Sequence, residues 1–300
     1  MSVPHADASP SSDAGSPTQT TPGGSRSAGP DTPSLAPDTV LAGRFRIVRY
    51  LARGGMGEVY EARDLELREE VALKTVRAEI AGDPQALERF RNEVHLARKV
   101  THPNACRIFD VFHHRSDGDR DTVFLTMELL RGETLDARLR RTGRLAPAAT
   151  LPLAEQMGAA LEAAHRAGVI HRDFKTGNVI LVPEPDGSER AVVTDFGLAR
   201  RAAGVDASLS GSGENRTEYA VGTPAYMAPE QVEGGPLSPA TDVYAFGVVL
   251  FELLTGGRPF AGDTPIEIML KRLREAPASP RSLVRDLDPR WEAVVLRCLE

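Results

Sequence analysis

Between residues 43 and 75, apolar and polar positions alternate in short runs that are separated by turn residues. Phe45 and Ile47 alternate with arginines, a glycine-rich stretch follows, and a second apolar run ends at Lys74. A period of two with turn residues between the runs is typical of strands, so this stretch predicts three of them. Further along the chain, two more short β-rich runs predict strands over 107–112 and 122–127.

The spacing of apolar residues changes to three and four between positions 84 and 100. Leu87, Phe90, Val94 and Ala97 recur there with charged residues between them, which predicts an amphipathic helix. After residue 134 helical spacing dominates, and two short strands interrupt it. The helices expected in that part span 135–141, 148–167, 240–254, 265–274 and 289–299, and the strands span 179–182 and 191–194.

These elements predict an α+β fold with two lobes. A β-rich lobe with one main helix covers about 43–130, a larger and mostly helical lobe covers about 131–300, and we expect the chemistry in the cleft between them. Residues 1–42 are predicted to be a disordered tail, because 29 of the first 40 residues are Ala, Gly, Pro, Ser or Thr. The predicted last helix has no stop signal, so we expect the final helices of the larger lobe to be missing.

Composition and charge exclude several classes of protein. The 36 basic and 42 acidic residues give a net charge of -6, which provides no positive field for a nucleic-acid backbone. The two cysteines, Cys106 and Cys298, are far apart and predict neither a disulfide framework nor a zinc site. The longest apolar run, 243–254, is too short to span a membrane, and the first residues lack a secretory leader. We therefore expect a cytoplasmic protein, and leave open a membrane tether beyond residue 300.

Several short motifs follow one another in a characteristic order. The glycine-rich stretch 51–59 is weak evidence alone, because a plain hairpin turn would look the same. The later motifs are 171–178 (HRDFKTGN), 195–197 (DFG) and 228–230 (APE). Together with Lys74 on a predicted strand, this set resembles the signature of protein kinases over residues 43–300. The amino-acid sequences of these motifs are similar to those of bacterial serine/threonine kinases of the eukaryotic-like type.

The resemblance implies an enzyme that transfers the γ-phosphoryl group of Mg-ATP to serine or threonine hydroxyls of proteins. Asp173 would orient the substrate hydroxyl and accept its proton, and Lys175 would support the transferring phosphate. Asp195 and Asn178 would bind Mg²⁺, which prefers oxygen ligands. The partners implied are ATP and protein substrates, without nucleic acid.

The resemblance also implies a nucleotide site in the β-rich lobe. Lys74 would bind the α- and β-phosphates of ATP, held by an ion pair with Glu93 on the predicted helix. Apolar residues would sandwich the adenine, with Met127 as gatekeeper and 128–130 supplying backbone hydrogen bonds; ordinary core packing explains the same residue types. The nucleotide-binding set is Leu51, Gly54, Gly55, Met56, Gly57, Val59, Ala72, Lys74, Met127, Glu128, Leu130 and Ile180.

Regulation is expected in the segment between Asp195 and Glu230. Kinases with an arginine at the position of Arg172 commonly need a phosphate in this segment, and Ser212 and Thr217 are the expected acceptors. The proposed route is phosphorylation of one copy by another through transient self-association. Thr223, in a Gly-Thr-Pro sequence, favours serine/threonine over tyrosine specificity.

Two alternatives stay open at this point. A pseudokinase would keep the fold as an ATP-binding scaffold, and Ala52, where the glycine-rich loop usually begins with glycine, leans that way. The intact Lys74, Asp173, Asn178 and Asp195 argue against it. A small-molecule phosphotransferase of similar fold would share the catalytic core, but we would not expect it to carry the segment 222–230.

Overall fold

The computed structural model describes residues 33–55, 57–115, 121–196 and 223–300. Residue contacts divide the chain into two units, and the second, residues 34–300, contains all the helices and strands below. Most of the predicted tail, residues 1–32, lies outside the described residues.

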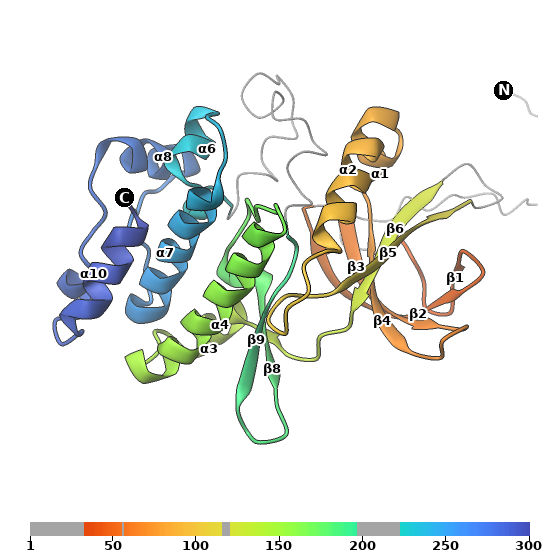
Figure 1. The fold of residues 1–300 in the computed structure, drawn as a ribbon, viewed down its shortest axis with the longest axis horizontal. Helices are drawn as coiled ribbons and strands as arrows, with labels where there is room; N and C mark the ends of the chain where they lie inside the picture. Colours follow the sequence, from red (N-terminus) through yellow and green to blue (C-terminus); the bar gives the residue numbers. More distant parts are fainter. Residues whose placement is uncertain (1–32, 56, 116–120, 197–222) are drawn as a thin grey trace, which may run out of the picture. The chain divides into compact units, whose positions relative to one another are not determined.

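The smaller lobe is built on one antiparallel sheet, with strand order β1-β2-β3-β4-β6-β5 (Figure 1). Alternating apolar residues place Phe45 and Ile47 on a buried face, together with Tyr60 and Leu73. The other face of the sheet carries the residues expected at the nucleotide. The strands are β1 (Val40–Leu41), β2 (Phe45–Gly54), β3 (Gly57–Asp64), β4 (Glu70–Thr75), β5 (Ile108–His114) and β6 (Thr122–Glu128).

Helix α2 (Pro84–Ala97) is the main helix of the smaller lobe, and the short α1 (Ala78–Ala81) precedes it. Its first turn is fixed by Pro84 and by Asp83, whose side chain accepts a hydrogen bond from the Gln85 amide. Phe90 and Val94 are buried in a cluster shared with β5 and β6, as the apolar spacing predicted.

Residues 34–41 are ordered, although their composition assigned them to the tail. β1 pairs with the start of β2, and Leu41 is buried in the same cluster as Phe45. Leu35 packs against this cluster as well. The ordered lobe therefore begins before residue 43. Counting small and polar residues missed this, because two leucines are enough to anchor a segment of eight residues on an apolar sheet face.

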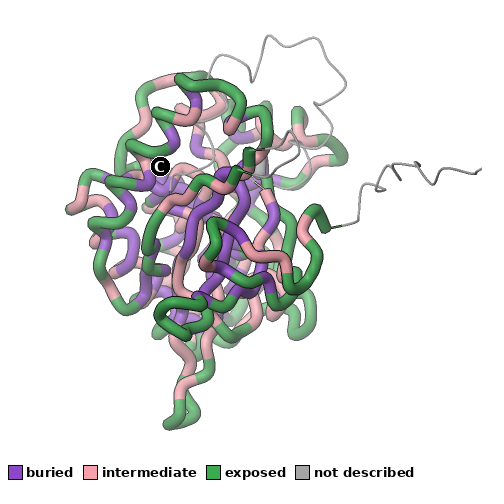
Figure 2. Tube along the Cα trace, turned by 90° about the vertical axis from the view of Figure 1, so that its right-hand side faces the viewer, coloured by how far each residue is buried: buried purple, intermediate pink, exposed green. Residues whose placement is uncertain are grey.

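The larger lobe is mainly helical and has its own hydrophobic core. Its central helix α7 (Pro239–Thr255) begins at the Ser238 cap and ends at Gly256 in a left-handed conformation. Figure 2, viewed from the side of the smaller lobe, shows buried residues concentrated in the interior and exposed residues at the periphery. The other helices are α3 (Leu135–Thr142), α4 (Pro147–Arg166), α6 (Pro229–Glu233), α8 (Pro265–Arg274), α9 (Pro280–Leu283) and α10 (Pro289–Cys298), with short 3-10 turns η1 (Thr176–Asn178) and η3 (Thr223–Tyr226).

A small sheet, β7 (Glu133–Thr134), β8 (Val179–Pro183) and β9 (Glu189–Val193), forms the edge of the larger lobe that faces the smaller one. The linker after α2 joins it, because the Cys106 amide donates to the Val193 carbonyl at 2.8 Å. The α+β architecture with two lobes is the one that the sequence predicted. Within the described ranges, no helix is both long and apolar enough to span a bilayer.

Candidate active site

A buried aspartate fixes the backbone of the loop that follows α4. Asp242, at the start of α7, is fully buried and accepts hydrogen bonds from the backbone amides of His171 at 2.7 Å and Arg172 at 2.8 Å. His165 contacts the same carboxylate through Nε2 at 2.7 Å. Arg172 itself has a positive φ of 66°, a strained conformation for a residue with a side chain. The carboxylate thus holds the loop in a shape that the backbone alone would not favour.

The loop presents Asp173 at the junction of the two lobes. Its carboxylate accepts a hydrogen bond from Lys175 Nζ at 2.7 Å, and its backbone carbonyl accepts one from the Asn178 side-chain amide at 2.8 Å. Asp173 and Lys175 both remain partly exposed. A carboxylate that is held in place by a neighbouring lysine and stays open to solvent is suited to orient a hydroxyl and to accept its proton.

Lys74 of the smaller lobe and Asp195 of the larger lobe form an ion pair. Lys74, on β4, is buried, and its Nζ lies 2.6 Å from Asp195 Oδ1, just beyond β9. Burial by itself would raise the pKa of the Asp195 carboxyl group. The charge of Lys74 and its hydrogen bond outweigh this, so the pKa lies below its ordinary value and the group is ionised at neutral pH. Asp195 also has a positive φ of 63°.

The predicted ion pair between Lys74 and Glu93 is wrong for this structure, in which each of the two residues has another partner. Glu93, on α2, instead pairs with Arg172, with Oε1 2.9 Å from Nη1, while Lys74 pairs with Asp195. The sequence places an acidic side chain on the inner face of the helix but cannot tell which cation it meets. In the structure the arginine guanidinium, with its several donors, reaches the carboxylate from the loop below.

Asp195 and Asn178 fit the role of oxygen ligands for a divalent cation. The amide of Thr194 donates to the Asn178 backbone carbonyl at 2.8 Å, which places the residue before Asp195 directly against Asn178. Because the side-chain nitrogen of Asn178 already donates to Asp173, its oxygen is the atom left to accept. Two oxygen ligands from the protein are suited to Mg²⁺ that is also held by phosphate oxygens.

The residues expected around the nucleotide share one face of the sheet. Val59 pairs with Lys74, and Ala72 pairs with Met127, so these four side chains point to the same side. Ala72 is buried, whereas Val59 and Met127 are half-buried. Leu51 lies at an irregularity in the pairing of β2 with β3, and the Glu128 amide donates to the Arg107 carbonyl at 2.9 Å. Leu130 and Ile180 are half-buried as well, with Ile180 on β8.

The glycine-rich stretch forms a tight hairpin between β2 and β3. Gly54 pairs with Gly57, and Gly55 lies in the turn. Gly57 has a φ of 151°, and a Cβ atom there would lie 2.0 Å from the Thr75 carbonyl oxygen. Only glycine allows this close approach of two strands. Met56 of this hairpin lies outside the described residues.

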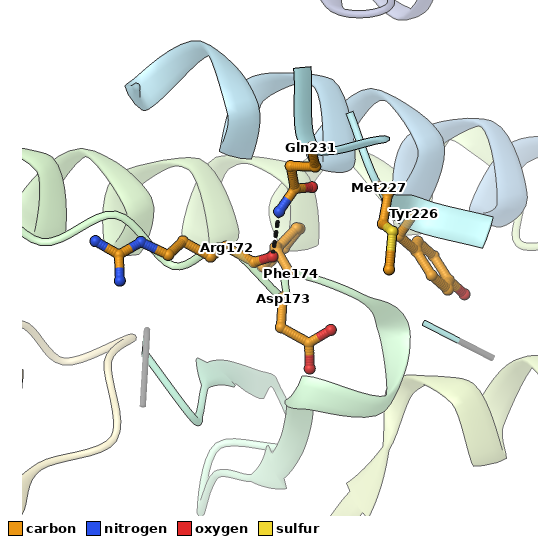
Figure 3. Close-up of a pocket in the computed structure, with 6 residues that line it drawn as sticks. All are labelled: Arg172, Asp173, Phe174, Tyr226, Met227 and Gln231. Carbon is orange, nitrogen blue, oxygen red and sulfur yellow. Dashed lines mark hydrogen bonds between the residues drawn. The ribbon is translucent and has the colours of Figure 1, made fainter. Parts of the chain in front are cut away.

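The segment around η3 packs against the loop that carries Asp173 and leaves a small hollow beside this residue (Figure 3). Gln231 donates to the Arg172 carbonyl at 2.9 Å, and the side chains of Arg172 and Asp173 point in different directions. Tyr226 OH contacts Thr176 Oγ1 at 2.9 Å. The hollow is lined by Arg172, Asp173, Phe174, Tyr226, Met227 and Gln231.

Arg272 is a residue of this region that no motif indicated. It is buried on α8 and donates to the carbonyls of Pro224 at 2.6 Å and Ala225 at 2.7 Å. The aromatic rings of Tyr244 and Phe260 lie within 6 Å of its guanidinium. The sequence offers one indication of this residue, an arginine among apolar residues on a predicted helix. That pattern does not predict which carbonyl groups the arginine contacts.

Of the residues expected to take part in regulation, Arg172 and Thr223 lie within the described part of the chain. Ser212 and Thr217 lie outside the described residues, so their expected phosphorylation stays a prediction. Thr223 begins η3, and Arg172 is engaged by Glu93. His171 is fully buried with its ring 5.0 Å from that of Phe196, which favours a structural role for this side chain over an acid–base role.

Comparison with known proteins identifies the family. Residues 45–299 match the model of the protein kinase domain, so the chain belongs to the protein kinase family. Its curated relatives include bacterial proteins named serine/threonine-protein kinases. PknA of Mycobacterium tuberculosis is 41% identical over 237 residues, which is 79% of this chain and 52% of PknA. Pkn3 of Myxococcus xanthus is 35% identical over 90% of this chain and 48% of its own length.

The chain therefore spans about half the length of these relatives. Among solved structures, the kinase domain of PknI from M. tuberculosis has a TM-score of 0.67 with 25% sequence identity, covering 89% of this chain and 92% of that one. The two-lobed protein kinase fold expected from the motifs is thus confirmed.

Proposed function

We propose that this chain is a serine/threonine protein kinase that transfers the γ-phosphoryl group of Mg-ATP to hydroxyl groups of proteins. One observation carries the proposal, namely that two pairs of polar residues from different elements lie where the lobes join. Lys74 reaches Asp195 across the lobes, and the Asn178 amide holds the loop at Asp173. In this proposal the catalytic domain includes residues 34–44, ahead of the family match.

Each side chain has one task in this reaction. Asp173 orients the substrate hydroxyl and takes up its proton as the oxygen attacks the γ-phosphorus, and the bond to the leaving ADP breaks in line. Lys175, 2.7 Å from Asp173, neutralises charge that develops on the transferring group. Lys74 binds the α- and β-phosphates. Asp195 and Asn178 would hold Mg²⁺, which supplies charge neutralisation between the phosphates.

The polypeptide around η3 supports a protein as the phosphate acceptor. Residues 224–226 are buried, Arg272 holds two of their carbonyls, and Gln231 connects the following helix to the catalytic loop. A platform built so tightly against Asp173 can position an extended peptide. A phosphotransferase for small molecules has no need of such a surface.

The test is transfer of labelled γ-phosphate from Mg-ATP to a generic basic protein, followed by analysis of the phosphorylated amino acids. Wild type is compared with Asp173→Asn, and Asp186→Asn, in the exposed β8–β9 turn, serves as the matched control. We expect phosphoserine and phosphothreonine from wild type and control. Mg-ATP binding by the wild type without any transfer would overturn the proposal in favour of an ATP-binding scaffold.

A further inference from the structure

The segment of residues 34–41, here called the N-terminal strap, runs beside β2 and packs Leu35 and Leu41 against the face of the small-lobe sheet opposite Lys74. Tyr60 follows Val59 on β3, so its side chain points away from the face that Val59 shares with Lys74. Leu41 lies in the same buried cluster as Tyr60, and Leu35 packs against it. The Asp38 backbone amide donates to the Ile47 carbonyl at 2.8 Å, and the Ile47 amide donates to the Thr39 carbonyl at 2.8 Å. All of the strap precedes residue 45, where the family match begins.

The first residue of the strap, Ser34, makes two hydrogen bonds to the carboxylate of Glu58. Its backbone amide donates to Glu58 Oε2 at 3.0 Å, and its hydroxyl donates to the same oxygen. The Leu35 amide donates to Tyr60 OH at 3.1 Å, and that hydroxyl in turn donates to Glu58. Ser34 itself is exposed, whereas Glu58 is buried.

Glu58 belongs to the glycine-rich hairpin. It follows Gly57 directly, and its backbone amide donates to Thr75 Oγ1 at 3.0 Å. Its other carboxylate oxygen pairs with Arg53 at 2.7 Å, across the hairpin. Contact between Ser34 and Glu58 therefore ties the strap to both strands that carry the hairpin.

The carboxylate is negatively charged at neutral pH. Burial alone would raise the pKa of Glu58, but hydrogen bonds from Ser34, Tyr60 and Arg53 lower it to about 2. A serine hydroxyl is a good partner for this charge because it donates a proton. Once Ser34 Oγ carries a phosphate, it has no hydroxyl proton to donate, and the phosphate adds about two negative charges at pH 7.

We propose that Ser34 is a phosphorylation site, modified by a second copy of this chain, and that the phosphate releases the N-terminal strap from Glu58 and loosens the glycine-rich hairpin. The inference rests on the proposed kinase activity. In the transfer, Ser34 Oγ forms a bond to the γ-phosphorus of ATP and the bond from that phosphorus to the bridging oxygen breaks. ADP leaves, and the hydroxyl proton passes to Asp173 of the transferring copy. A second copy is needed because Ser34 lies on the face of the sheet opposite Lys74.

The first experiment locates the modification. Wild-type chain is incubated with Mg-ATP and its peptides are analysed by mass spectrometry, with a generic basic protein present as a second acceptor. We expect phosphate on Ser34, and we expect Asp173→Asn chains to gain it only when wild type is added. Phosphorylated basic protein with unmodified Ser34 would overturn this inference alone. No phosphate on either acceptor would overturn the proposed function, and the inference with it.

The second experiment tests release and does not depend on kinase activity. Hydrogen exchange of amides 35–41 and 57–60 is compared in Ser34→Ala and Ser34→Asp, each with Glu58 or with Glu58→Gln. If repulsion between two negative charges drives release, Ser34→Asp exchanges about tenfold faster than Ser34→Ala when Glu58 is present, and less than twofold faster with Glu58→Gln. Equal ratios in both backgrounds, or slower exchange in Ser34→Asp through a new pair with Arg53, would overturn the proposal.

Discussion

Replacing Arg272 by methionine removes the connection between α8 and the segment that precedes α6. The guanidinium donates to two backbone carbonyls, at 2.6 and 2.7 Å, in a buried environment. Methionine fills a similar volume but donates nothing, so the carbonyls of Pro224 and Ala225 lose their only side-chain partner among the described residues. Lysine at position 272 would restore the positive charge but could not reproduce the pair of hydrogen bonds that two guanidinium nitrogens make to the two carbonyls.

The magnitude follows from opposing contributions. Hydrogen bonds from a charged donor contribute about 1.5 to 3 kcal/mol each. Burial of the guanidinium opposes them. It lowers the pKa of Arg272, and within the described residues Nε has no hydrogen-bond partner. We expect Arg272→Met to reduce the free energy of unfolding by about 2 to 3 kcal/mol. If half of that loss falls on the segment beside Asp173, the KM for a protein substrate rises about tenfold.

Two measurements check this prediction. Urea denaturation gives the change in free energy of unfolding, and steady-state kinetics give the KM for the protein substrate and for ATP separately. Arg274→Met, an exposed position on the same helix, is the matched control and should match wild type in both. Arg272→Met should leave the KM for ATP within about twofold of wild type, because among the described residues the hydrogen bonds and ring contacts of Arg272 lie within the larger lobe. The reasoning is refuted if Arg272→Met and Arg274→Met have the same KM for the protein substrate.

Three other substitutions test the scaffold around the site. Glu58→Gln should lower the free energy of unfolding by about 3 kcal/mol at pH 7, since the pKa of Glu58 is about 2 against 4.5 in the unfolded chain. Below pH 4.5 this difference should shrink and vanish near pH 2, as urea titrations at several pH values would show. Asp242→Asn puts a donor against the amides of His171 and Arg172 and should cost about 2 to 4 kcal/mol in the same assay; a cost below 1 would contradict the assigned bonds. Gly57→Ala should weaken Mg-ATP binding at least tenfold by calorimetry, because its methyl group meets a carbonyl oxygen; unchanged affinity would contradict the tight hairpin.

The lobes and most elements could be predicted from the sequence because they depend on local periodicity. Helix α2 is the best example, since Phe90 and Val94 recur at helical spacing and Pro84 marks its start. The strap shows the limit of this reasoning. Composition made residues 34–41 look disordered, whereas Leu35 and Leu41 gain their stability from a sheet face formed by distant strands.

The site shows the same division between local and distant information. Motifs predicted which residues take part; in the structure Lys74 pairs with Asp195, and the Asn178 side chain donates to the Asp173 carbonyl. The motifs did not predict the pairing, because an ion pair depends on which side chains the tertiary structure brings within reach. Glu93 pairs with Arg172 for this reason.

The central claim is that Asp173 acts on the acceptor hydroxyl while Asp195 acts on the metal-bound nucleotide. The most direct measurement compares Mg-ATP affinity and the single-turnover rate of transfer to a protein in Asp173→Asn and Asp195→Asn. We predict that Asp173→Asn binds Mg-ATP within about threefold of wild type but transfers about 10² to 10⁴ times more slowly. Asp195→Asn should lose most of the Mg²⁺-dependent affinity. Wild-type transfer rates in Asp173→Asn, or unchanged Mg²⁺-dependent affinity in Asp195→Asn, would contradict the account.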